Sequence, residues 1–418
     1  MPMSGYAGRG AKHADGKLTD LWAKALVIES KQGQRAVLVT YDLIGIDRGL
    51  SVAICNALQR KFELHRSAVA LNFSHTHTGP VVAKNLRPMH YMLLDEANRR
   101  LVDGYAQFLQ EKSVEVVGEA IANIAPAKLA WGSGTATFAA NRRNNKEAEV
   151  PELRKANELR GPFDHDVPVL VVSDAKDQLT AIAFGYACHN TTLGLLQWSG
   201  DYAGYAQLEI EKAHPGCIAL YWAGCGGDQN PLPRRTVELA KQHGGDLAEA
   251  VERTVGDSAA LRPIEGELST QYKEVDLALA RLPDRDELLR EAKSTNKYIA
   301  ARAKHHLGLL TTGKELSPAY PYPVQTWRLG DEVTFVFLGG EVVIDYAIRL
   351  KEELGSGRLD RKNVWVAGYS NDVMAYVPSR RVLTEGGYEG GGAMIYYGLP
   401  ANWSPQVEET IVEEVRRK

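Results

Sequence analysis

The run Ala68-Val69-Ala70-Leu71-Asn72-Phe73 is followed directly by Ser74-His75-Thr76-His77-Thr78-Gly79-Pro80. The first run is short, mostly apolar and closed by a turn signal, which is the pattern of a buried strand. If strand geometry continues through the pair, His75 and His77 project to the same side, because side chains alternate along a strand. Two imidazoles at a strand end are a common start to a divalent-metal site, and histidine also moves protons near neutral pH. Such pairs also occur in ordinary loops, so the pair alone does not establish a metal site.

Apolar runs followed by polar residues recur along the whole chain. Working outward from the first run, we expect strands at residues 22–30, 35–41, 68–73, 168–173, 179–187, 218–222, 333–338 and 364–369. Apolar residues at three- and four-residue spacing predict helices at residues 50–64, 96–124, 204–213, 237–255, 285–308 and 342–354. The alternation of the two kinds of element predicts a mixed α/β layer architecture.

Two further segments lack regular patterning. Residues 142–160 are the most polar part of the chain, and we expect them to form a surface excursion. The glycine-rich residues 386–392 are expected to form a mobile loop near a site, because so many glycines do not suit the interior of a regular element.

Composition excludes several classes of protein. The chain has 418 residues, of which 44% are hydrophobic and 24% charged, and a formal net charge of −3, which argues against a general nucleic-acid partner. No stretch approaches the roughly 20 apolar residues of a membrane span. Four cysteines lack any C-x-x-C spacing, and we expect buried free thiols at Cys55, Cys188, Cys217 and Cys225. No secretory leader is visible at Met1, so we expect a cytoplasmic protein, or a secreted or periplasmic one if a leader has been removed.

Polar residues of the kinds that bind metals or move protons cluster where the expected strands end. In α/β sheets, strand ends are where ligand sites form. Four of these residues offer the nitrogen and oxygen atoms that zinc prefers, namely His75, His77, His189 and Glu341. Asp228 and Asn371 are interpreted as turn residues, and Asp42 as a strand-end cap or a support for the site. His305 and His306 are interpreted as surface residues of a helix.

The chain resembles the catalytic domain of the neutral, non-lysosomal ceramidases, which are zinc-dependent amidases. The most specific similarities are the hexad at residues 75–80 and the Gly340-Glu341 pair before a helix. The resemblance implies mixed twisted sheets flanked by helices and a single catalytic domain over residues 1–418. The matching segments, in the order of the family, are Gly5-Tyr6-Ala7-Gly8-Arg9, Leu21-Trp22-Ala23-Lys24-Ala25, His75-Thr76-His77-Thr78-Gly79-Pro80, Asn141-Arg142, His189-Asn190-Thr191, Gly200-Asp201, Gly227-Asp228, Gly340-Glu341 and residues 371–388.

Carried over position by position, the resemblance implies one zinc ion per chain and a hydrolysis in which a metal-activated water attacks an amide or related carbonyl bond. It implies that His77 carries the proton and that Arg142 and Tyr388 contact the scissile group or its oxyanion. It further implies four metal ligands, namely His75, His189, Glu341 and Tyr376.

Two departures from the family bear on the substrate. The family has a serine where this chain has Asn230, and asparagine donates a hydrogen bond but cannot act as an alkoxide nucleophile. The immunoglobulin-like domain that follows the catalytic domain in the family is not expected within these 418 residues. We therefore expect a small-molecule substrate other than ceramide.

Three alternatives remain open at this point. The same site could cleave a polar substrate, such as a sugar derivative, by chemistry other than amide hydrolysis. The chain could be a binding homologue that lost catalysis through Asn230. An amidohydrolase barrel also places a His-x-His after a strand, but it needs a further strand-end histidine that we do not find after His189. For Tyr376, Arg142 and Tyr388, plain packing or solvation is the competing interpretation.

Overall fold

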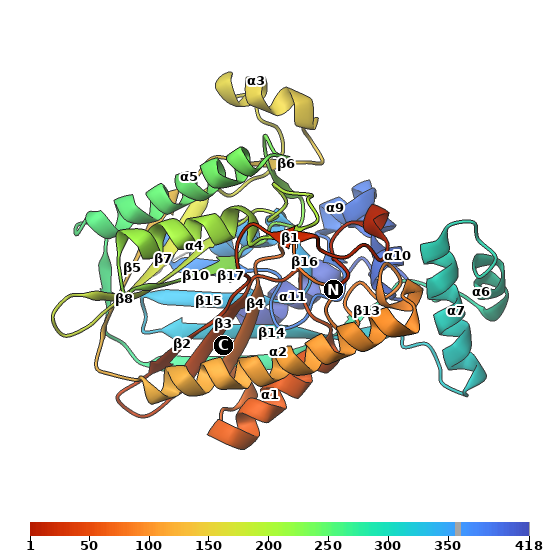
Figure 1. The fold of residues 1–418 in the computed structure, drawn as a ribbon, viewed down its shortest axis with the longest axis horizontal. Coiled ribbons are helices and arrows are strands. Elements are labelled where there is room, and N and C mark those ends of the chain that lie inside the picture. Colours follow the sequence, from red (N-terminus) through yellow and green to blue (C-terminus); the bar gives the residue numbers. More distant parts are fainter. Residues whose placement is uncertain (356–360, 418) are drawn as a thin grey trace.

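The computed structural model describes residues 1–355 and 361–417. Three larger β-sheets lie in the middle of the molecule, and helices cover their outer faces (Figure 1). The sheets contain both parallel and antiparallel strand pairs, so the expected mixed α/β fold is confirmed. Within the described residues, none of the helices combines the length and apolar character needed to cross a membrane.

The first sheet grows from the hairpin and the strand that precede His75. The hairpin is antiparallel, and its second strand pairs in parallel with the third strand. Val69, Leu71 and Phe73 pack toward the helices, and Ala70 packs toward the other sheets. Because both faces are buried, this strand reads as a nearly continuous apolar run. The elements are β2 (Ala23–Glu29), β3 (Arg35–Tyr41) and β4 (Val69–Phe73), with α1 (Arg48–Phe62) and α2 (Glu96–Ala122) against them.

The second sheet has five strands and carries two helices on its outer face (Figure 1). The strand order in this sheet is β10-β8-β7-β5-β12. The predicted runs at 168–173, 179–187 and 218–222 all lie in it. The strands are β10 (Ile218–Ala223), β8 (Leu179–Tyr186), β7 (Asp166–Ser173), β5 (Lys128–Thr135) and β12 (Arg262–Ile264), and the helices are α4 (Asp201–Ala213) and α5 (Val237–Gly256).

The third sheet shares a buried cluster with the first two and is backed by helices near the C-terminus. Two of its strands were not expected from the sequence, because one is half polar and the other contains Pro321 and Pro323. Both are long, and they pair over eleven residues. The elements are β13 (Leu268–Ala278), β14 (Ala319–Leu329), β15 (Val333–Leu338) and β17 (Val364–Ala367), with α8 (Ile344–Leu354) and α11 (Val407–Arg416).

Three short strand pairs lie beside these sheets. They are β1 (Gly16–Lys17) with β9 (Gln197–Trp198), β6 (Ala139–Asn141) with β11 (Gln229–Pro231), and β16 (Glu341–Val342) with β18 (Tyr376–Val377). The last pair is parallel and places Glu341 directly opposite Tyr376. In the second, Asn230 lies opposite Ala140, close to the start of the polar segment that carries Arg142.

The remaining helices correct two expectations. The single helix expected at 285–308 is wrong, because two helices form and Asn296 begins the second by accepting bonds from its first turn. His306 is also not a surface residue, because it is only 4% exposed. The polar segment 142–160 contains a short helix that projects from the body of the molecule (Figure 1). These helices are α3 (Val150–Lys155), α6 (Arg285–Glu291), α7 (Lys297–Thr311), α9 (Arg380–Glu385) and α10 (Met394–Tyr397).

An aromatic core joins the inner faces of the second and third sheets, and Ala36, Leu38 and Ala70 of the first sheet pack into the same cluster. Trp222 of β10 packs against Phe335 of β15 and Trp365 of β17, with ring centroids 4.8 and 6.4 Å apart. Large buried rings contribute much of the apolar area removed from water on folding. The ends of β4, β10 and β17 are thereby held together, and the polar residues that follow them meet.

Asn72 forms a polar joint between these three strand ends. Its side-chain oxygen accepts a bond from the Ala223 amide at 2.8 Å, and its amide nitrogen donates to the Gly368 carbonyl at 2.9 Å. Asn72 is fully buried. We expect Asn72→Ala to lower the free energy of unfolding by about 1–3 kcal/mol for each backbone group left unpaired.

Chemical denaturation of the variant and the wild type measures this difference. Asn123→Ala is the matched control, because the Asn123 side chain donates to one backbone carbonyl at 2.9 Å on the exposed end of α2. A loss of stability for Asn72→Ala that is no larger than for the control would contradict the joint.

Candidate functional site

The His-x-His pair lies in a turn, not in the strand. The strand β4 ends at Phe73, and His75 adopts a left-handed backbone conformation with φ of 60°. The expected continuation of the strand through the pair is therefore wrong. The two rings nevertheless converge, with 3.1 Å between the His75 and His77 Nε2 atoms. The His75 amide, which donates to the Leu43 carbonyl at 2.9 Å, holds the turn beside β3.

The other three expected ligands lie around the same point. Nε2 of His189 is 2.9 Å from Oε2 of Glu341, and Nε2 of His75 is 3.2 Å from that oxygen. The hydroxyl of Tyr376 is 3.2 Å from Nε2 of His189. The loop after β8, the pair β16–β18 and the turn after β4 thus bring residues 75, 189, 341 and 376 together. All four are at least 95% buried.

Backbone carbonyls fix the orientation of two of the imidazole rings. Nδ1 of His75 lies 2.7 Å from the Ile44 carbonyl, and Nδ1 of His189 lies 2.6 Å from the Gly226 carbonyl. A carbonyl only accepts, so each Nδ1 carries the proton and each Nε2 presents a lone pair. Both lone pairs face the Glu341 carboxylate.

This donor set fits a metal ion. Oε2 of Glu341 is buried and lacks a hydrogen-bond partner among the described residues, although two imidazole nitrogens lie close to it. Acceptors this close repel each other unless a cation or a proton lies between them. Zinc ligands at about 2.0–2.1 Å from the ion lie roughly 3.3 Å apart in a tetrahedron, which is near the separations seen here. The ligand atoms of His75, His77 and His189 also lie within 4.8 Å of one another, so this buried group could hold a metal ion.

Burial and neighbouring charges shift the acidity of the central groups. Burial, together with the neighbouring Arg142 charge, lowers the pKa of His189 to about 4. Burial is the main cause that holds the pKa of His77 well below its usual value, and the neighbouring His75 and His189 lower it in the same direction. Burial alone would raise the pKa of Glu341, but His75 and His189 outweigh it and hold that pKa well below the usual range. These shifts favour neutral rings at His77 and His189 beside an ionised Glu341 carboxylate.

Arg142 lies beside the expected metal ligands and donates hydrogen bonds to several neighbouring residues. Its Nη2 donates to the Tyr376 hydroxyl at 3.0 Å and to the Gly227 carbonyl at 2.8 Å, and its Nη1 donates to Oδ1 of Asn230 at 3.3 Å. Because a guanidinium only donates, Asn230 must turn its oxygen toward Arg142 and its amide N–H groups away. The solvated charge that was the competing interpretation of Arg142 does not describe these contacts.

Tyr388, which belongs to the glycine-rich segment, lies next to Tyr376, one of the four expected metal ligands. Its ring packs edge-on against the Tyr376 ring, with centroids 5.3 Å apart, and its side chain is about half exposed. The segment is not the plain loop that was expected, because Tyr388–Gly392 forms a π-helical turn containing the non-helical Gly391.

Sequence reasoning missed several residues that contact the site, among them Tyr369, Tyr397 and Glu389. Tyr397 donates a hydrogen bond to Oε1 of Glu341, and Glu389 accepts from Nε of Arg142 at 2.7 Å. Neither belongs to a motif with recognisable spacing. The single signal that could have found Glu389 is a carboxylate set among glycines next to Tyr388.

The N-terminal segment covers the His77 side of the site. The ring of Tyr6 packs edge-on against His77, with centroids 4.7 Å apart. Arg9 is buried and donates hydrogen bonds to the His77 and Ser4 carbonyls and, at 2.8 Å, to the Leu195 carbonyl. The segment 5–9 thus restrains the backbone of His77 without touching the carboxylate of Glu341.

Asp228, Asn371 and Asp42 lie around the site without entering it. Asp228 accepts from the Ile344 amide at 2.9 Å and so anchors the start of α8 after Glu341. Asn371 has φ of 65°, which suits a turn residue. Asp42 accepts from the Trp22 amide at 3.1 Å, and burial raises its pKa to about 6.

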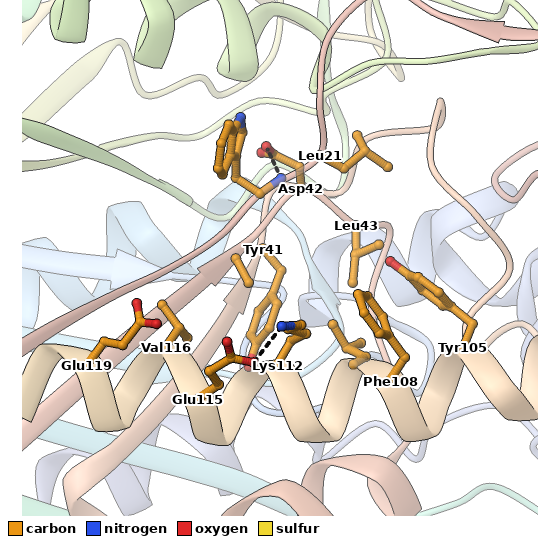
Figure 2. Close-up of a pocket in the computed structure, with 13 residues that line it drawn as sticks. Leu21, Tyr41, Asp42, Leu43, Tyr105, Phe108, Lys112, Glu115, Val116 and Glu119 are labelled. Atoms are coloured by element: carbon orange, nitrogen blue, oxygen red, sulfur yellow. Dashed lines mark hydrogen bonds and ion pairs between the residues drawn. The ribbon is translucent and has the colours of Figure 1, made fainter.

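A separate pocket lies on the outer side of Asp42. Figure 2 shows this pocket, with a volume of about 270 Å³, between the ends of β2 and β3 and the helix α2. Trp22, Phe108 and Tyr105 contribute rings to it, and Lys112 and Glu115 form an ion pair at its edge. None of the expected metal ligands lines this pocket.

Comparisons with known proteins agree with this architecture. Two neutral ceramidases, from Drosophila pseudoobscura pseudoobscura and Drosophila melanogaster, are each 23% identical over 229 residues, which is 51% of this chain and 31% of the relatives. The match therefore spans about a third of the length of these relatives. A solved ceramidase complexed with C2 aligns over 99% of this chain and 71% of its own, with a TM-score of 0.72 and 18% identity. A neutral ceramidase from Pseudomonas aeruginosa aligns over 99% of this chain and 70% of its own, with a TM-score of 0.69 and 19% identity.

The structural likeness shows that the whole described chain shares the fold of these ceramidases. The family model for the N-terminal part of neutral/alkaline non-lysosomal ceramidases matches residues 1–221, which is more than half of the chain. The matched residues include the His-x-His turn, Arg142 and His189. The chain therefore belongs to the neutral/alkaline non-lysosomal ceramidase family.

Proposed function

We propose that this chain is a zinc-dependent hydrolase that uses water to cleave an amide or a related carbonyl bond, in a substrate other than ceramide. The observation that carries the proposal is the convergence of Nε2 of His75, Nε2 of His189 and Oε2 of Glu341, an oxygen to which none of the described residues donates a hydrogen bond. We assign one zinc ion per chain to these residues and to Tyr376. The residues involved come from positions 75 to 388, so the proposal treats residues 1–418 as one catalytic domain.

The metal, when bound, supplies a Lewis acid that polarises a carbonyl and lowers the pKa of water. The protein supplies the ligands and the orientation of their rings. The Ile44 and Gly226 carbonyls hold the Nδ1–H groups of His75 and His189, so both rings present Nε2 without reorganising. Tyr397 holds the other oxygen of Glu341 in the same way.

We assign proton transfer to His77. Its Nε2 faces the centre, and its buried Nδ1 has no hydrogen-bond partner among the described residues. The ring is therefore not committed to one tautomer by a backbone carbonyl, unlike the rings of His75 and His189. Neutral at the start, His77 accepts a proton from the attacking water at Nε2 and later donates one to the leaving group.

We assign stabilisation of the developing oxyanion to Arg142, Asn230 and Tyr388. Arg142 has five N–H groups and uses four in the hydrogen bonds formed with protein groups, which leaves one on Nη1. The amide N–H groups of Asn230 point away from Arg142, and the centroid of the Tyr388 ring lies 5.8 Å from the Arg142 guanidinium carbon. Donors placed where negative charge develops are typically worth about 10²–10³ in rate.

The substrate assignment rests on Asn230. An asparagine preserves a hydrogen-bond donor but supplies no hydroxyl, so a substrate that relies on a serine hydroxyl at this position loses that contact. The charged side chain of Arg142 contacts Asn230 directly. A polar amide or ester fits this environment. The sugar-derived substrate and the non-catalytic homologue remain the second and third candidates.

Metal analysis and a substrate panel test the proposal together. Protein purified without chelator is expected to contain about one zinc ion per chain, and to hydrolyse members of a panel of polar amides and esters faster than ceramide. A zinc content well below one per chain would count against the metal site. Clear ceramide hydrolysis would eliminate the proposed substrate class, and zinc-loaded protein without turnover on any amide, ester or glycoside would favour a binding homologue.

A further inference from the structure

Glu389 is a buried carboxylate between two arginines that follow β6. Its Oε1 accepts from Nε of Arg142 at 2.7 Å, and its Oε2 accepts from Nη1 of Arg143 at 2.6 Å. Glu389 is 4% exposed. Hydrogen bonds between charged groups are about twice as strong as neutral ones, and breaking a buried pair leaves a charge without compensation. The carboxylate is therefore the main counter-charge on the Arg142 side.

The bond from Nε determines where the rest of the Arg142 guanidinium points. The group is planar, so an anchor on Nε orients both Nη atoms. With Nε on Glu389, Nη2 reaches Tyr376 and Gly227, and Nη1 reaches Asn230. The contacts other than Glu389 are a hydroxyl, a carbonyl and an amide oxygen, which are neutral and weaker. Glu389 is thus the strongest restraint on the guanidinium.

The same carboxylate fixes the segment that carries Tyr388. Gly386 and Gly387 have φ of 71° and 77°, which is a left-handed path that glycine adopts easily. The Gly386 carbonyl accepts from Nη2 of Arg143 at 3.0 Å. The residue after Gly387 is Tyr388, whose ring packs on Tyr376. Arg142 and Arg143, which follow β6, therefore hold this turn in place through their bonds to Glu389 and to the Gly386 carbonyl.

We propose that Glu389 is a positioning residue, which holds the Arg142 guanidinium toward the reacting group and keeps the Tyr388 turn against Tyr376. This inference rests on the proposed function, because it gives Arg142 and Tyr388 their roles at the oxyanion. Glu389 does not touch the reacting atoms and acts through its two partners. Loss of its charge leaves Arg142 buried without its nearest anion, and the guanidinium and the turn then sample other positions.

Glu385 provides a matched control on the same segment. Its Oε2 accepts from Nη2 of Arg143 at 3.1 Å, and it also pairs with Arg381 at 3.0 Å. Its side chain is 43% exposed, and it makes no contact with Arg142. Glu385→Gln removes the same charge at the last residue of α9, just before the turn, and leaves the anchor of Arg142 in place.

The test compares Glu389→Gln with Glu385→Gln and the wild type, all loaded with zinc. On the best substrate of the panel, Glu389→Gln is expected to lower kcat about 10- to 100-fold with a smaller change in KM, because a misplaced group loses rate more than binding. Glu385→Gln is expected to remain within about two-fold of the wild type. Glu389→Asp keeps the charge and is expected to restore part of kcat.

Two further measurements do not need turnover. The Nε–H signal of Arg142, assigned by its loss in Arg142→Lys, is expected to be protected from solvent exchange in the wild type and in Glu385→Gln, and to lose protection in Glu389→Gln. Hydrogen exchange of the backbone amides of residues 386–393 should increase in Glu389→Gln alone. Circular dichroism and zinc content of each variant identify any that fails to fold.

Each result decides one of two questions. If the wild type hydrolyses nothing on the panel, the proposed function fails, and the Arg142 signal and the loop exchange still decide the position of the guanidinium. If the wild type is active and Glu389→Gln keeps wild-type kcat, Nε–H protection and loop exchange, the positioning role is overturned. A loss of kcat that Glu385→Gln reproduces would also overturn it, because the effect would then follow from Arg143.

Discussion

His77→Ala is expected to retain its zinc and to lose turnover by a factor of about 10²–10⁴, the usual effect of removing a general acid–base group. The structure gives a physical reason to separate His77 from its neighbours. The Nδ1 atoms of His75 and His189 donate to backbone carbonyls, whereas the buried Nδ1 of His77 has no partner in the described part of the chain. A ring that is free to exchange protons between its two nitrogens suits proton transfer better than metal ligation. Zinc content and kcat on the same preparation measure both parts of this expectation.

His75→Ala is the companion variant, and it is expected to lose the metal as well as turnover. The two histidines lie in one turn and their Nε2 atoms are 3.1 Å apart, so both variants perturb the same backbone. If His77→Ala loses zinc while His75→Ala retains it, the two roles are exchanged. If both lose zinc, His77 is also a ligand, and the three-histidine group binds the ion.

Removal of the metal is expected to abolish turnover and to destabilise the fold. Without a cation, Oε2 of Glu341 faces the lone pairs of two neutral imidazoles in a buried site. An ion that binds only the folded chain adds about 4 kcal/mol to the free energy of unfolding when its free concentration is 1,000 times Kd. Dialysis against a chelator, followed by denaturation and activity assays, measures both effects, and added zinc should restore both.

Glu341→Gln and Glu115→Gln control this experiment. Glu341→Gln is expected to bind zinc weakly, so the chelator should barely change its stability. Glu115 forms an exposed ion pair with Lys112 on α2, and Glu115→Gln should respond to the chelator as the wild type does. Wild-type protein whose activity and stability both survive complete removal of the metal would contradict the metal-dependent mechanism.

The sequence predicted those elements whose pattern is local. The strands β2, β3, β4, β7, β8, β10, β15 and β17 are short apolar runs, and the hydrophobic pattern predicts each of them within a few residues. The strand β5 was missed because Gly132 and Gly134 interrupt its hydrophobic pattern. In the structure, α5 packs against this strand. The strands β13 and β14 were missed because their polar residues and prolines disguise a long pairing.

The contacts of the site show the same limit. The His-x-His turn can be recognised from six consecutive residues, and the family resemblance implied Glu341 and Tyr376. Glu389 meets Arg142 across 247 positions, and Tyr397 meets Glu341 across 56. No local pattern specifies partners so distant in the chain. The burial of His306 likewise depends on the surroundings of α7 and not on the helix itself.

The orientation of His75 and His189 depends on main-chain oxygens of Ile44 and Gly226. Every amino acid has a backbone carbonyl oxygen. The residue types of Ile44 and Gly226 therefore do not reveal that their backbones orient the histidine rings. A substitution of Ile44 that still fills its buried place can therefore leave the ring of His75 aligned. Engineering that reroutes the main chain there, by insertion, deletion or proline, would disturb the histidine even though every recognised motif remained intact.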